Sequence, residues 1–120
     1  MTSQSVESPS ELYAVADFCL IPIGTGEPSV AEYIAECHRV LEKSGLNFQM
    51  HGYGTNLEGP WSQVMQAIRD CHAAVHVKGA PRVATDIRIG TRVDKELVPG
   101  QGNEDKLKRV QQILASDNKE

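Results

Sequence analysis

The spacing of the apolar residues changes along the chain in a fixed order, and this order is the strongest constraint on the fold. Alternation of apolar and other residues, which marks strands, occurs over 12–23, 47–52, 55–58 and 82–90. Spacings of three and four, which mark amphipathic helices, occur over 29–45 and 60–79. The resulting order predicts an α+β fold: a ferredoxin-like β-α-β-β-α-β sandwich with an antiparallel four-stranded sheet.

A chain of 120 residues has room for one hydrophobic core, so we expect a single domain over 12–115. The polar run 1–11 predicts a disordered tail, and 116–120 predict a frayed end. A loop over 95–103 should lead into an additional C-terminal helix that Asn103 caps. The apolar stripe of this helix is Leu107, Val110, Ile113 and Leu114.

Local signals give the expected ends of the two main helices. Ser29 and Glu32 have the spacing of a capping box, and Gly45 follows the last turn of the first helix. Pro60 suits the first position of the second helix, which should run to Gly79. Pro22 should end the first strand.

The alternation also divides the sheet into two faces. The face expected beneath the helices carries Ala14, Ala16, Phe18, Leu20, Phe48, Met50, Leu57, Val83, Thr85, Ile87 and Ile89. The uncovered face should carry Asp17, Cys19, Ile21, Gln49, His51, Asn56, Glu58, Arg82, Asp86 and Arg88. This face mixes apolar with charged groups, so a second copy of the chain is its simplest cover. We therefore expect a homo-oligomer, either a dimer or a tetramer.

Composition excludes several classes of partner. A net charge of −4 with 5% aromatic residues argues against a nucleic-acid surface. The longest apolar run, 18–23, is too short to cross a membrane, and the first residues do not resemble a secretion signal. Three cysteines without C-x-x-C spacing predict reduced thiols, no structural zinc and a cytosolic location. We expect a small molecule as partner, and no membrane or nucleic acid.

Catalytic and metal sites find little support. His72 and His76 are four residues apart, but a third metal ligand is not evident, so no metal is expected. Asp17 and Glu58 share the uncovered face and could act as paired carboxylates. No set of nucleophile, base and orienting group accompanies them, and the prediction is a protein that is not an enzyme and requires no cofactor.

The stretch 53–61 is the candidate binding site, because it gathers a hydroxyl, an amide, a carboxylate and aromatic rings beside glycines that allow close approach. Its candidate ligand-binding residues are Thr55, Asn56, Glu58 and Trp61, to which the uncovered face adds Asp17 and His51.

Three segments carry a resemblance to a known family. ADFCLIPIGT (16–25), GTNLEGPW (54–61) and TDIRIGTR (85–92) resemble the thiamine-binding protein family of the YkoF-like group, and its fungal members in particular. The Thr-x-x-Glu-Gly element, with Thr55 and Glu58, is its most specific part. The resemblance implies a dimeric or tetrameric ferredoxin-like protein that binds thiamine or its hydroxymethylpyrimidine moiety, with no established reaction.

The sequence is compatible with three functions. The first is a non-enzymatic thiamine or pyrimidine binder, acting as a carrier, buffer or sensor. In it, Glu58 would engage the aminopyrimidine, while Trp61 or Tyr53 would hold the cationic thiazolium. The second is a structural or regulatory oligomerisation module without a ligand. The third is an enzyme that uses Asp17, His51 or Glu58.

Overall fold

The computed structural model describes residues 11–117, so residues 1–10 of the tail expected over 1–11 lie outside the described part, as do the last three residues of the sequence. Glu11, the last residue of that expected tail, accepts from Ser62 Oγ at 2.8 Å. The elements in chain order are β1 (Tyr13–Ile23), α1 (Ala31–Ser44), β2 (Asn47–His51), β3 (Gly54–Pro60), α2 (Trp61–Lys78), β4 (Arg82–Gly90) and α3 (Gly102–Asp117). The predicted α+β, ferredoxin-like order with one additional C-terminal helix is confirmed. The last helix includes Ser116 and Asp117, two residues beyond the expected end of the domain.

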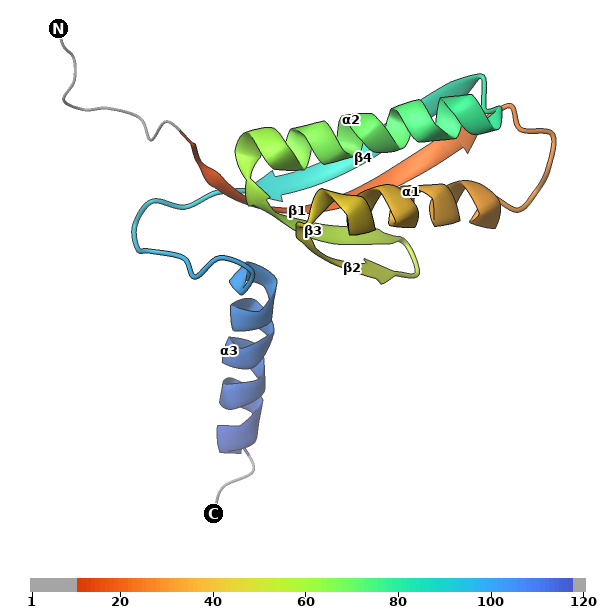
Figure 1. The fold of residues 1–120 in the computed structure, drawn as a ribbon. Helices are drawn as coiled ribbons and strands as arrows, with labels where there is room; N and C mark the ends of the chain where they lie inside the picture. Colours follow the sequence, from red (N-terminus) through yellow and green to blue (C-terminus); the bar gives the residue numbers. More distant parts are fainter. Residues whose placement is uncertain (1–10, 118–120) are drawn as a thin grey trace, which may run out of the picture.

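The four strands form one sheet in the order β2-β3-β1-β4, and every neighbouring pair is antiparallel. Helices α1 and α2 lie side by side over one face, whereas α3 extends away from them (Figure 1). The core lies between the sheet and these two helices. Its buried apolar residues are Ala14, Ala16, Phe18, Leu20, Cys37, Leu41, Leu57, Val64, Ala67, Ile68, Cys71, Val75 and Ala80.

The division of the strands into two faces is confirmed. Ala16 pairs with Leu57 on one side and with Ile89 on the other, and these side chains face the helices. Asp17 pairs with Asn56 and Arg88 on the opposite face. We call this second surface the open face, because neither α1 nor α2 covers it.

β1 ends at Ile23, the last residue of the strand predicted over 12–23 and one residue past Pro22. The predicted starts of the two main helices are wrong. Ser29 lies one residue before the N-cap of α1, so its Oγ accepts from Ala31 N at 3.3 Å instead of closing a capping box. Glu32 reaches Lys78 of α2 at 3.6 Å. Pro60 is the N-cap of α2, not its first residue, and the N–H of Trp61 donates to Leu12 O at 2.7 Å.

Helix α3 contacts the rest of the fold mainly through its first turn. Its apolar stripe is exposed: Leu107 by 50%, Val110 by 55%, Ile113 by 46% and Leu114 by 56%. The expected cap, Asn103, lies inside the helix, because α3 begins at Gly102 and its first N–H groups donate to Glu58 of β3. None of the helices within 11–117 is both long and apolar enough to cross a membrane.

Candidate binding site on the open face

A row of polar side chains crosses all four strands on the open face. Strand register places Gln49 beside Asn56, Asn56 beside Asp17 and Asp17 beside Arg88. We call these four residues the polar row. Of the candidate residues, Asp17 and Asn56 belong to it, while His51 and Glu58 lie on the same face one pair further along their strands.

His51 and Asp17 form a pair across this face. His51 Nε2 lies 2.6 Å from Asp17 Oδ1, and His51 Nδ1 accepts from the N–H of Tyr53 at 3.2 Å. Since Nδ1 is an acceptor, the ring proton belongs on Nε2, where it donates to the Asp17 carboxylate. Gly54 lies between them on β3, and a Cβ there would come within 3.4 Å of His51 Cε1. Both ring nitrogens are thus occupied within the fold.

The structure does not bring Thr55 and Trp61 to this surface. Thr55 pairs with Phe18 and Met50 and faces the helix layer. It is three residues from Glu58, and an odd spacing in a strand puts two side chains on opposite faces. Trp61, at the start of α2, is 38% exposed and not part of the core.

Glu58 is the only charged or polar residue among the buried side chains of the described chain, at 5% exposure. Its Oε1 accepts from Tyr13 Oη at 2.8 Å and from Gly102 N at 2.7 Å, while Oε2 accepts from Asn103 N at 3.1 Å. The two backbone donors are the first N–H groups of α3. A carboxylate of β3 therefore caps the C-terminal helix and complements its dipole.

Neighbouring contacts fix the segment that leads into α3. The N–H of Gly100 donates to Tyr13 Oη at 2.6 Å, and Asn47 Nδ2 donates to the carbonyl of Gly100. Gly102 packs so closely that a Cβ would lie 2.5 Å from Val15 Cγ2 and 3.0 Å from Glu58 Oε1. Tyr13, Glu58, Gly100 and Gly102 thus join α3 to the sheet; we call these four residues the docking cluster.

The docking cluster predicts an unusual tyrosine titration. Burial raises the pKa of Tyr13 to about 12 from 10.0; the hydrogen bond and charge of Glu58 add to this, and the N–H of Gly100 opposes it. Because the folded pKa exceeds the unfolded one, the stabilisation is complete below pH 10 and is lost as pH rises through 12. Tyrosinate absorbance should show one late-titrating tyrosine that is absent from Tyr13→Phe. A wild-type titration identical to that of the variant would contradict the cluster.

A hollow of about 500 Å³ opens between the open face and the start of α3, which is within the usual size range of small-molecule sites. Five primary amides line it: Asn47, Gln49, Asn56, Gln101 and Asn103. Glu58, Glu104, Lys108, Phe48, Leu107 and Gly100 complete the lining. We call it the amide-lined pocket. It contains two of the six candidate residues, Asn56 and Glu58; Asp17 and His51 lie beside it on the sheet.

The two histidines spaced for a metal have other partners. His72 Nε2 contacts Thr85 Oγ1, and His76 Nδ1 contacts the carbonyl of Ala80 at 2.8 Å. Within residues 11–117 there is no group of three or more His, Cys, Asp or Glu side chains arranged to hold a metal ion.

Comparison with known proteins agrees with the fold and the sequence segments. Residues 16–111 match the family described as "Thiamine-binding protein". The chain belongs to this family. It is 44% identical to a UPF0045 protein of Synechocystis, over 83% of this chain and 78% of that one. It is also 38% identical to a UPF0045 protein of the fungus Eremothecium gossypii, over 88% of this chain and 97% of the relative.

Solved structures share this architecture. A hypothetical protein of Methanocaldococcus jannaschii superposes with a TM-score of 0.70 at 32% identity, covering 82% of this chain and 95% of that one. A Thermotoga maritima protein, described as a candidate for thiamine biosynthesis or salvage, has a TM-score of 0.63 over 79% of this chain and 98% of its own. Its identity of 13% makes it a likeness of fold alone.

Proposed function

We propose that this protein binds thiamine, or the hydroxymethylpyrimidine moiety of thiamine, in the amide-lined pocket and does not transform it. The observation that carries the proposal is the concentration of five primary amides with Glu58 in one hollow of the open face. Membership in a family described as thiamine-binding supports the choice of ligand.

The chemistry of the pocket suits an aminopyrimidine. The ring offers nitrogen acceptors beside an exocyclic amine donor, and each primary amide presents a donor next to an acceptor. Asn56 and Gln49 are neighbours across two strands and can address one edge of the ring together. Glu58 contributes the acceptor capacity of Oε2 that Asn103 N leaves free, because a carboxylate oxygen can accept two hydrogen bonds.

The thiazolium cation requires an anionic or aromatic neighbour. Glu104 supplies the carboxylate within the pocket, and Leu107 supplies apolar surface. The two aromatic residues expected from the sequence lie elsewhere. Trp61 and Tyr53 do not line the pocket, and Tyr53 in the turn between β2 and β3 is 89% exposed. We therefore propose that carboxylates, and not an aromatic face, stabilise the positive charge of the ligand.

A binding role without turnover agrees with the state of the three residues that an enzyme would use. Glu58 accepts from three donors, and both nitrogens of His51 are engaged with Asp17 and the Tyr53 amide. Glu58 and His51 are thus held in contacts that stabilise the fold, with Asp17 as the partner of His51. The role we propose is that of a carrier, buffer or sensor of the ligand in the cytosol.

Titration calorimetry with thiamine and with hydroxymethylpyrimidine tests the site. Asn56→Leu removes one amide from the pocket at nearly constant volume and should weaken binding about tenfold or more, since the partner group on the ligand loses its hydrogen bond. Thr55→Val is the matched control on the opposite face and should bind as the wild type does. If Thr55→Val abolishes binding while Asn56→Leu retains it, the pocket is not the site. No heat with either ligand would favour the oligomerisation module.

We also propose that the protein is a homo-oligomer, because the open face and the stripe of α3 leave apolar side chains exposed. Leu107, Val110, Ile113 and Leu114 are each about half exposed, and Ile21 on the sheet is 39% exposed. Light scattering should give a dimer or tetramer at micromolar concentration, and Val110→Lys with Leu114→Lys should shift the mass toward the monomer. A wild-type monomer would contradict this.

A further inference from the structure

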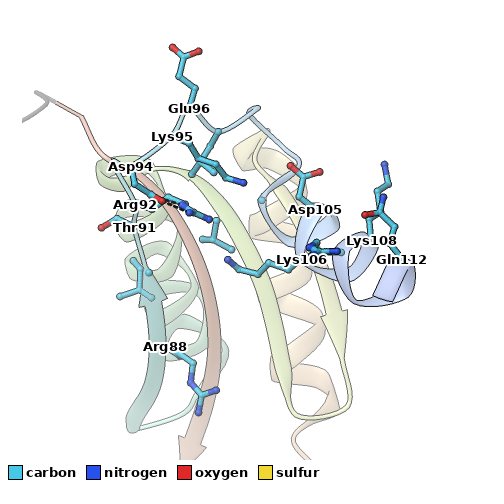
Figure 2. Close-up of a pocket in the computed structure, with 16 residues that line it drawn as sticks. Arg88, Thr91, Arg92, Asp94, Lys95, Glu96, Asp105, Lys106, Lys108 and Gln112 are labelled. Carbon is cyan, nitrogen blue, oxygen red and sulfur yellow. Dashed lines mark hydrogen bonds and ion pairs between the residues drawn. The ribbon is translucent and has the colours of Figure 1, made fainter. Parts of the chain in front are cut away.

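A second and larger hollow, of about 1060 Å³, lies on the other side of the α3 docking contact. It is bounded by the end of β4, the segment 91–97 and the outer side of α3 (Figure 2). We call it the basic cleft. The contact between Glu58 and Gly102 lies between it and the amide-lined pocket, and no residue of the polar row except Arg88 lines it. Lys108 of α3 borders both hollows, but the amides and carboxylates of the proposed thiamine site line only the amide-lined pocket.

The basic cleft concentrates positive charge in an acidic chain. Six of the twelve lysines and arginines line it: Arg88, Arg92, Lys95, Lys106, Lys108 and Arg109. Three acids, Asp94, Glu96 and Asp105, share the lining, while the whole chain carries −4. A concave surface lined by one sign of charge raises the local concentration of ions of the opposite sign.

Little of this charge is neutralised within the cleft. Arg92 pairs with Asp94, and this hydrogen bond lowers the pKa of that carboxyl to about 2. The Glu96 carboxylate points away from the cleft, whereas Lys95 and Lys106 reach into the space between the loop and α3 (Figure 2). Among the described residues, no carboxylate lies within 4.0 Å of the charged groups of Arg88, Lys95, Lys106 or Arg109.

We propose that the basic cleft binds a phosphorylated small molecule, with a phosphate monoester or a diphosphate as the recognised group. Lysine amines act as point charges and arginine forks as bidentate donors for phosphate oxygens. Thr91 adds a hydroxyl, and Gly90 leaves the backbone open, since a Cβ there would have nothing within 4 Å. The volume accommodates a diphosphate together with an organic group attached to it.

A nucleic acid fits these observations less well. Backbone recognition requires a basic stripe that follows several phosphates, and the rest of this chain is acidic. Lys95 from the loop and Lys106 from α3 instead reach into one space between these two elements, whereas Arg88 lies further along β4 (Figure 2). A compact anion satisfies that arrangement.

The test is a calorimetric titration of the full chain with inorganic pyrophosphate, thiamine diphosphate and thiamine. Pyrophosphate should bind, and Lys95→Gln with Lys106→Gln should weaken it about tenfold or more. Arg39→Gln with Lys43→Gln on α1 removes the same charge far from the cleft and should leave the affinity within about twofold. Thiamine affinity should not change in the Lys95 and Lys106 variant, which separates this proposal from the thiamine site.

The two phosphate sources are distinguished by the same titrations. If thiamine diphosphate binds more tightly than pyrophosphate, and if the Lys95 and Lys106 variant loses this affinity, the occupant is an organic diphosphate. Equal affinities identify the phosphate group alone. The proposal is overturned if pyrophosphate does not bind, or if the α1 control loses as much pyrophosphate affinity as the Lys95 and Lys106 variant. It is also overturned if an oligonucleotide, titrated in the same way, binds more tightly than either diphosphate.

Discussion

Replacing Glu58 with alanine should release α3 from the sheet while leaving the core folded. The carboxylate accepts from Tyr13 Oη and from the first two N–H groups of α3, so its removal leaves three donors without their partner. Hydrogen bonds to a charged, buried group contribute about 1.5 to 3 kcal/mol each, although undocking lets water satisfy part of them. We expect docking of α3 to weaken by about 2 to 3 kcal/mol. Amide exchange at Gly102 and Asn103 should then accelerate roughly 30- to 150-fold.

Two further variants make this result specific. Glu58→Gln keeps a carbonyl oxygen that accepts one bond, so its effect should be intermediate. Glu42→Ala, which removes an exposed glutamate of α1, should leave exchange in α3 unchanged. Trypsin offers a second measurement, because Lys106, Lys108 and Arg109 become better substrates when the helix opens. Unchanged exchange and cleavage in Glu58→Ala would show that the carboxylate does not hold the helix.

Substitution of Gly102 by valine should undock α3 by steric means. The first added carbon would lie 2.5 Å from Val15 Cγ2 and 3.0 Å from Glu58 Oε1, and Val15 is a β-branched residue in a strand with little freedom to move. We expect amide exchange across 102–106 to rise to the level seen in Glu58→Ala. Gly52→Ala in the turn before β3 is the control, because a Cβ there meets nothing within 4 Å. Native exchange in Gly102→Val would contradict the close packing of α3 on β1.

Both docking variants bear on function, because α3 forms one wall of each hollow. Leu107 and Lys108 line the amide-lined pocket, and Lys106 and Arg109 line the basic cleft. Glu58→Ala and Gly102→Val should therefore weaken thiamine and pyrophosphate together. Asn56→Leu should weaken the binding of thiamine alone. The paired substitutions of Lys95 and Lys106 should weaken the binding of pyrophosphate alone.

The fold could be read from the sequence because its information is local and periodic. Alternation over 82–90 and over 12–23 fixes which side chains face the helices, and the order of the elements fixes the sheet. The same parity places Asn56 and Glu58 on the open face. It also separates Thr55 from Glu58, so a site containing both was at odds with the strand that carries them.

The role of Glu58 as a helix cap could not be read locally. Its partners Tyr13 and Gly102 are 45 and 44 residues away in the chain. Rules for helix ends search the adjacent residues, and they selected Asn103 because it was the nearest capping type. The loop predicted over 95–103 was not expected to contribute to the site, although it supplies Gln101 and Asn103 to the amide-lined pocket, and Glu104 follows them. Its one visible signal was the pair of glycines at 100 and 102, which permit the close approach to β1.

The most direct test of the thiamine site is a titration of isotope-labelled protein with thiamine, followed residue by residue through its amide resonances. The proposal predicts shifts concentrated at Gln49, Asn56 and 101–104, the residues around the amide-lined pocket. The amide resonance of Met50, which pairs with Thr55 and whose side chain lies on the helix-covered face, should shift less. Shifts centred on Trp61 and the helix-covered side of β3, with the amide-lined pocket unaffected, would contradict it.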